Sequence, residues 1–135
     1  MIKKAILAIV SLLCIYSCKH KDKDTLLLER YLQKQFNKDI AKDNSTYVLV
    51  ADQACSGCLK YIFDKAKSPP DHYIFILPKP RDNHNYTHPN VLIDPSGNLG
   101  RLKFHMGNVC TIKTQDGVVT GVQVYDPAQV VNIFQ

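Results

Sequence analysis

Residues 47–67 decide the fold, and they read YVLVADQACSGCLKYIFDKAK. The first five, 47–51, form an apolar run rich in β-branched residues, which is typical of a strand buried on both faces. From Leu59 onward, apolar side chains recur at steps of three, four and seven residues, which is the spacing of one helical face. Between strand and helix stand Cys55 and Cys58. The stretch therefore predicts a strand that delivers a Cys-x-x-Cys pair to the first turn of a helix.

This placement predicts different chemistry for the two cysteines. The unpaired N–H groups and the positive end of the helix dipole lie beside the first sulfur and favour its thiolate. Cys55 is therefore the predicted nucleophile. Cys58 lies one turn along the helix, close enough to form a disulfide with Cys55 but with fewer open amides to stabilise its anion. We therefore expect Cys58 to be the resolving thiol.

The C-terminal part of the chain completes a known pattern. Residues 108–134 contain a β-branched run, an Asp-Gly turn, a second run and a closing helix that begins with proline. Together with 47–67 and the apolar run 72–77, this stretch resembles the thioredoxin-like superfamily. The resemblance implies an α/β fold, a three-layer sandwich whose central mixed sheet has about four strands and helices on both faces. It also implies thiol–disulfide exchange, which needs no dissociable cofactor.

Two further helices are expected outside the central stretch. Residues 25–40 carry apolar side chains at every fourth position, which predicts an amphipathic helix with Thr25 as its N-cap. Residues 126–134 begin with Asp and Pro, which suit the first positions of a helix. The expected apolar side of this closing helix consists of Val130, Val131 and Phe134.

The first seventeen residues are expected to be a signal peptide. Residues 1–4 are basic and 5–15 are apolar, and this run is shorter than the roughly 20 residues that a membrane-spanning helix needs. Residues 15–18, Ile-Tyr-Ser-Cys, resemble the bacterial lipobox. That resemblance implies that Cys18 becomes the first mature residue and carries lipid, with fatty acids such as palmitate. The alternative is an uncleaved membrane anchor.

The expected organisation is a signal peptide over 1–17, a lipidated anchor and linker over 18–24, and a thioredoxin-like domain over 25–135. Without Lys3 and Lys4, the mature chain keeps 15 of its 17 basic residues against 12 acidic ones, a formal charge of about +3. The basic residues do not cluster with aromatic side chains, so nucleic acid is not an expected partner. We expect a membrane-anchored lipoprotein of the cell envelope that faces the periplasm or the exterior.

Cys110 departs from the family pattern. Relatives usually carry a cis-proline at the matching position, beside the Cys-x-x-Cys pair. A cis bond before a non-proline residue costs about 2.5–4 kcal/mol, so the bond before Cys110 should be trans. Cys110 has three interpretations: a small buried apolar residue, a third redox thiol, or a metal ligand together with Cys55 and Cys58. His105 or a histidine of the loop 78–89 would complete such a metal site.

The sequence thus favours a lipid-anchored thiol–disulfide oxidoreductase that exchanges disulfides with envelope proteins through Cys55 and Cys58. Its expected partners are envelope proteins with thiols or disulfides, and the membrane through the lipid. The first alternative is a metal-binding lipoprotein that holds zinc or copper with Cys55, Cys58 and Cys110. The second is an interaction module in which the Cys55–Cys58 disulfide is only structural.

Overall fold

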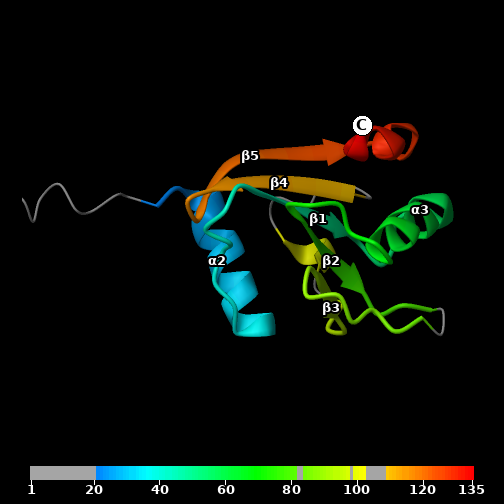
Figure 1. Cartoon of the computed structure of the whole chain (residues 1–135), viewed down its shortest axis with the longest axis horizontal. Coiled ribbons are helices and arrows are strands. Elements are labelled where there is room, and N and C mark those ends of the chain that lie inside the picture. The colour runs from blue at the N-terminus through cyan, green and yellow to red at the C-terminus, as the bar shows by residue number, and fades with distance from the viewer. Residues whose placement is uncertain (1–20, 82–83, 98, 103–108) are drawn as a thin grey trace, which may run out of the picture.

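The elements of the fold follow the order that the sequence suggests, with additions. The computed structural model describes residues 21–81, 84–97, 99–102 and 109–135. Along the chain (Figure 1) these residues form α2 (Lys23–Phe36), β1 (Ser45–Val50), α3 (Ser56–Ala66), β2 (Tyr73–Pro78), β3 (Val91–Asp94), the 3₁₀ turn η1 (Leu99–Arg101), β4 (Val109–Gln115), β5 (Val118–Tyr125) and the 3₁₀ helix η2 (Pro127–Phe134).

The strands form one mixed sheet. Among the described residues it has five strands in the order β3-β2-β1-β4-β5. The pairs β1–β2 and β2–β3 are parallel, whereas β4 is antiparallel to both β1 and β5. The predicted α/β class with a mixed sheet is confirmed, but the expected number of about four strands is wrong. The additional strand, β3, has only four residues, too few for a periodic pattern to identify it, and it forms by pairing with β2.

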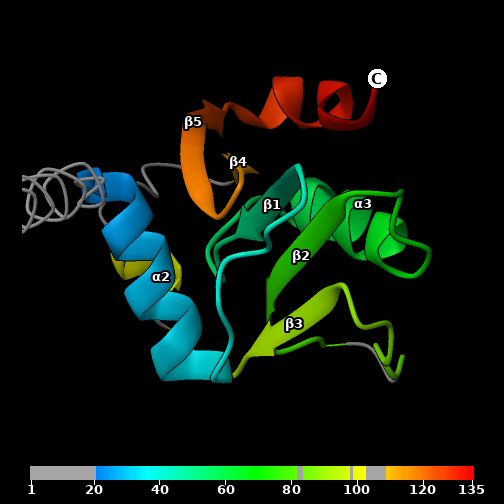
Figure 2. The same cartoon turned by 60° about the vertical axis from the view of Figure 1, so that its left-hand side comes forward.

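Each face of the sheet is covered by different helices. Along β1, Val48 and Val50 belong to a buried cluster with α3 and η2, whereas Tyr47 and Leu49 belong to a second cluster with α2. This division follows from the strand period, since successive side chains point to opposite faces. Figure 2 shows α2 on one side of the sheet and α3 on the other. From Tyr47 to Val50, β1 is therefore apolar on both faces, as a strand buried on both sides requires.

The N-terminal cap of α2 differs from the expectation. Asp22, not Thr25, is the N-cap, because its carboxylate accepts from the Thr25 backbone N–H at 2.8 Å and from the Thr25 hydroxyl at 2.9 Å. Thr25 lies inside the first turn and is buried. Its Oγ1 accepts from the Val119 N–H at 2.9 Å, which joins α2 to β5. An aspartate at the N-cap satisfies the open amide of the third helical residue and stabilises the positive helix end.

Replacing Asp22 with alanine should lower the free energy of unfolding by about 1 kcal/mol at neutral pH. The bond from the Thr25 N–H is the main cause that lowers the pKa of Asp22 below its ordinary value of 3.8. The contribution of this carboxylate is therefore complete well above pH 3.8 and is lost as the pH falls through the lowered pKa in the folded protein. Urea unfolding of wild type and Asp22→Ala from neutral pH to below pH 3.8 measures the loss of stability and its dependence on pH. Asp43→Ala, at an exposed position, is the control. Equal losses in both variants would contradict the cap.

The C-terminal hairpin is confirmed. β4 and β5 are joined by Asp116 and Gly117, whose φ angles of 52° and 74° are both positive, as a type I′ turn requires. The bond before Cys110 is trans, since no described peptide bond is cis. The antiparallel pairing of β4 with β1 places Cys110 opposite Leu49, inside the sheet.

The closing helix has a different buried side from the predicted one. η2 is a 3₁₀ helix, in which Val130 and Ile133 are buried while Val131 is 49% exposed. The prediction for Val131 is therefore wrong. A 3₁₀ helix has three residues per turn, so positions 130 and 133 share a side, whereas the α-helical spacing would pair 130 with 131 and 134. Phe134 still packs on the domain, against the rings of Tyr73 and Phe75.

Candidate functional site

The site begins where β1 ends. Val50 and Ala51 are fully buried, and the chain then reverses through a turn in which the Ala54 N–H donates to the Ala51 carbonyl at 3.0 Å. Cys55 follows, with φ −55° and ψ 143°, and is the N-cap of α3. The first helical bond runs from the Leu59 N–H to the Cys55 carbonyl at 2.9 Å. The predicted strand–turn–helix arrangement of the pair is confirmed.

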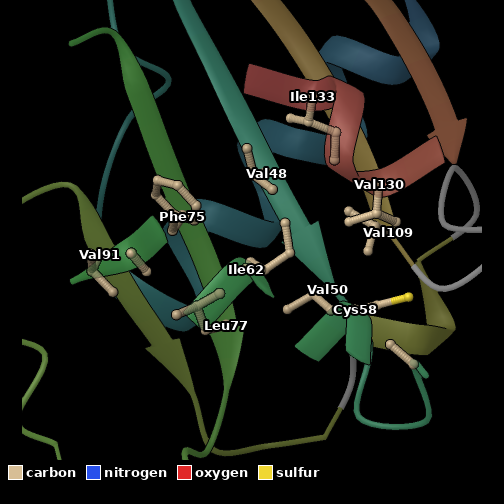
Figure 3. Close-up of a cluster of buried hydrophobic side chains, with 12 residues drawn as sticks. Val48, Val50, Cys58, Ile62, Phe75, Leu77, Val91, Val109, Val130 and Ile133 are labelled. Atoms are coloured by element: carbon tan, nitrogen blue, oxygen red, sulfur yellow. The ribbon is translucent and has the colours of Figure 1, made fainter. Parts of the chain in front are cut away.

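The two cysteines form a disulfide, with their Cα atoms 5.1 Å apart. Their environments differ. Cys58 is 3% exposed and belongs to the core cluster that α3 buries with Val50 and Ile62 (Figure 3). Cys55 is half-buried at the rim of the same cluster. An incoming sulfur can therefore reach Cys55 more easily than Cys58.

The N-terminus of α3 places positive partial charge beside the sulfur of Cys55. The Cys58 backbone N–H donates to Cys55 Sγ at 3.0 Å, so the first sulfur occupies the capping position that an oxygen occupies in most helices. In the reduced protein, this amide and the positive end of the helix dipole favour a thiolate at Cys55. The residues of the first turn of α3 carry no acidic side chain that would oppose this charge.

A second segment supports the turn before Cys55, and sequence reasoning missed it. A Cβ added at Gly97 would lie 3.2 Å from Asp52 Oδ2, and one added at Gly100 would lie 2.6 Å from Gln53 Nε2. The segment after β3 therefore packs closely on the turn that precedes Cys55. Gly97 also has a φ of 66°, which favours glycine. The Asp94–Gly97 turn pattern is visible in the sequence, but nothing there indicates which element it contacts.

Cys110 lies on the other face of the sheet. It is fully buried in the cluster formed with α2, together with Leu28 and Leu32. Its Sγ donates to the Thr111 carbonyl at 3.7 Å. Burial, with a smaller effect from the charge of Asp24, raises the pKa of Cys110 to about 12. The structure therefore does not bring its sulfur to Cys58, which the α3 face buries, and its environment matches that of a small apolar residue.

The histidines do not gather around the cysteines in the described part of the chain. His72 precedes β2, at the amino end of the strand, whereas Cys55 follows the carboxyl end of the parallel β1. His84 packs its ring on Tyr86, and His88 Nδ1 accepts from the Asn90 N–H at 3.1 Å. The described residues contain no group of three His, Cys, Asp or Glu side chains that could hold a metal ion. His105 lies outside them.

The predicted signal peptide and Cys18 also lie outside the described residues. Within the residues that the structure does describe, no helix is long and apolar enough to cross a membrane.

No protein-family model, no curated protein and no solved structure matches this chain. Its function is therefore inferred from the geometry of the Cys55–Cys58 pair and from the elements that hold it.

Proposed function

We propose that this protein is a thiol–disulfide oxidoreductase with a thioredoxin-like fold. The observation that carries the proposal is the half-buried Cys55 at the N-cap of α3, bonded to a Cys58 that the core buries. One sulfur is accessible and stabilised as a thiolate, and the other is protected from outside attack. These are the properties that a nucleophilic and a resolving thiol require.

The arrangement of the elements supports the thioredoxin-like assignment. β1 leads into the Cys-x-x-Cys pair, α3 connects it to the parallel β2, and the β4–β5 hairpin is followed by a closing helix. The chain departs from the family at Cys110, where relatives carry a proline, and at the added edge strand β3. Cys110 lies across the sheet from the pair, and the segment after β3 packs on the turn that precedes Cys55.

In the proposed reaction, the Cys55 thiolate attacks one sulfur of a partner disulfide. A bond forms between Cys55 and that sulfur, the partner's S–S bond breaks, and the second partner sulfur leaves as a thiolate and takes up a proton. The Cys58 thiol then loses its proton and attacks Cys55 Sγ, which forms the Cys55–Cys58 disulfide and releases the first partner thiol. The partner gains two electrons and two protons. This protein supplies both electrons and the proton of Cys58, and water supplies the second proton, because Cys55 reacts as a thiolate. Another protein dithiol restores the reduced pair by the reverse exchange.

Redox titration tests the proposal. Equilibration of the pair with mixtures of reduced and oxidised glutathione should give a potential between about −270 and −120 mV, the range of known exchange proteins. The reduced protein should also reduce insulin. Cys110→Ser should leave the potential unchanged, because its sulfur lies across the sheet from the pair. A potential below about −300 mV without insulin reduction would indicate a structural disulfide and would overturn the proposal.

We also propose that Cys18 is lipidated and anchors the domain to an envelope membrane, where its partners are other envelope proteins with thiols or disulfides. The support is the basic and apolar order of residues 1–15 and the lipobox-like ending at Cys18. Metabolic labelling with an alkyne analogue of palmitate should mark the wild-type protein and not Cys18→Ser. Equal labelling of both would exclude lipidation at this residue.

A further inference from the structure

A groove of about 720 Å³ runs between α3 and the chain that leaves β2. Its apolar lining comes from Leu59 and Phe63 of α3 and from Pro78 and Pro80 on the opposite side. Tyr86, farther along the same loop, packs its ring edgewise on Phe63 at 5.5 Å, so the loop is held against the helix. The groove is therefore formed by packed elements and has an apolar floor.

The rim of this groove is mainly cationic. Four basic side chains line it against two carboxylates, those of Asp52 and Asp64. Asp64 accepts from Lys67 at 2.9 Å, so these two charges compensate each other. Lys60, Lys79 and Arg81 are exposed and form no salt bridge with any residue that the structure describes. Lys60 also interacts electrostatically with Asp64. Among the described lining residues, four cations therefore stand against two carboxylates, and Lys79 and Arg81 are the cations on the side opposite α3.

The groove reaches the turn that precedes the cysteine pair. Asp52 lines it and lies in the turn that precedes Cys55. On α3, the lining residues follow one stripe, and the position four residues before Lys60 is Ser56, directly after Cys55. From Leu59 to Lys67 the helix rises about 12 Å, which is the length of about four residues of extended peptide. A chain in this groove would continue toward the accessible sulfur.

We propose that the groove binds an extended, acidic and partly apolar segment of the partner protein, next to the partner cysteine that Cys55 attacks. The inference rests on the proposed redox function, since it assigns the groove to the same encounter. The concave apolar floor suits side chains of a peptide, and the cations of the rim suit its carboxylates. A flat anionic membrane surface would fit the charges but would leave the floor uncovered.

Peptide binding tests the groove without any redox chemistry. The probes are two fluorescein-labelled peptides with the same apolar residues and a central serine in place of cysteine, one with Asp and Glu around it and one with Lys. In fluorescence anisotropy at low salt, the acidic peptide should bind about tenfold more tightly than the basic one, and added salt should weaken its binding.

The double variant Lys79→Glu/Arg81→Glu should remove this preference. Lys38→Glu/Lys42→Glu, which changes the net charge equally at exposed positions between α2 and β1, should retain it. Equal affinity for the two peptides, or an unchanged preference in the Lys79/Arg81 variant, would overturn the proposal. So would binding of vesicles with anionic phospholipid that depends on Lys79 and Arg81 while neither peptide binds.

Disulfide versions of the same peptides separate this proposal from the proposed function. Reduced wild-type protein should reduce the acidic peptide disulfide about tenfold faster than the basic one, and the Lys38/Lys42 variant should keep this ratio. Wild-type protein should also reduce the neutral hydroxyethyl disulfide, which carries no charge for the groove to recognise. Failure to reduce hydroxyethyl disulfide would overturn the redox function. The anisotropy measurements with the serine peptides would still show whether the groove binds an acidic segment. Reduction of both peptides at one rate would overturn the role of the groove and leave the redox function standing.

Discussion

Cys55→Ser should reduce insulin no faster than buffer alone, and Cys58→Ser should accumulate a mixed disulfide with its substrate. Serine cannot form an S–S bond, so the first variant lacks the proposed nucleophile at the N-cap of α3. The second keeps the accessible sulfur but lacks the thiol that displaces the substrate. The two variants therefore stop the same reaction at different steps.

Mass spectrometry distinguishes the two outcomes. Reduced Cys58→Ser mixed with glutathione disulfide should gain the mass of one glutathione at Cys55, and added dithiothreitol should remove it. Cys55→Ser should gain much less, because Cys58 is 3% exposed in the core. The reverse pattern, with faster reaction at Cys58, would contradict the assignment of roles. Cys110→Ser is the matched control and should behave as wild type, because burial raises the pKa of the Cys110 thiol to about 12.

The elements with strong local signals were predictable. The apolar run, the Cys-x-x-Cys pair and the apolar positions of α3 lie within twenty-one consecutive residues, 47–67, so no distant contact had to be known. The Asp116-Gly117 turn is equally local, because both positions need positive φ and the sequence offers residues that tolerate it. The cysteine pair of the candidate site could therefore be found without the structure.

The features that depend on distant contacts could not be predicted. The side on which Cys110 lies is fixed by its register opposite Leu49, and a shift of one residue would turn it to the other face. Threonine is a residue type that often caps helices, but the hydroxyl of Thr25 accepts a hydrogen bond from the Val119 N–H of β5. Asp22 is the N-cap instead. The groove beside α3 needs the loop after β2 to fold back, which no local pattern indicates.

The contact between α2 and the end of β3 is the other place where a large effect is expected. Asp94 is 1% exposed, and its Oδ2 accepts from the Tyr31 hydroxyl at 2.6 Å. Its Oδ1 accepts from the backbone N–H of Ser96 at 2.8 Å and from the Ser96 hydroxyl. Burial and the neighbouring Asp94 raise the pKa of Tyr31, so its hydroxyl stays protonated and continues to donate. One buried carboxylate thus joins α2 to the turn that packs on Asp52.

Replacing Asp94 with alanine should lower the free energy of unfolding by about 2–3 kcal/mol, because it leaves the buried hydroxyl of Tyr31 and the amide and hydroxyl of Ser96 without this acceptor. Asp94→Asn keeps an acceptor of the same shape and should lose less. Urea unfolding of Asp94→Ala, Tyr31→Phe and the double variant should give a coupling energy of about 1 kcal/mol or more, since the two side chains are in direct contact. The exposed Asp71→Ala serves as control. Additive losses would show that the Tyr31–Asp94 bond contributes nothing to stability. The position of the turn before Cys55 would then depend on the bonds of Ser96 to Asp94 and on the packing of Gly97 and Gly100.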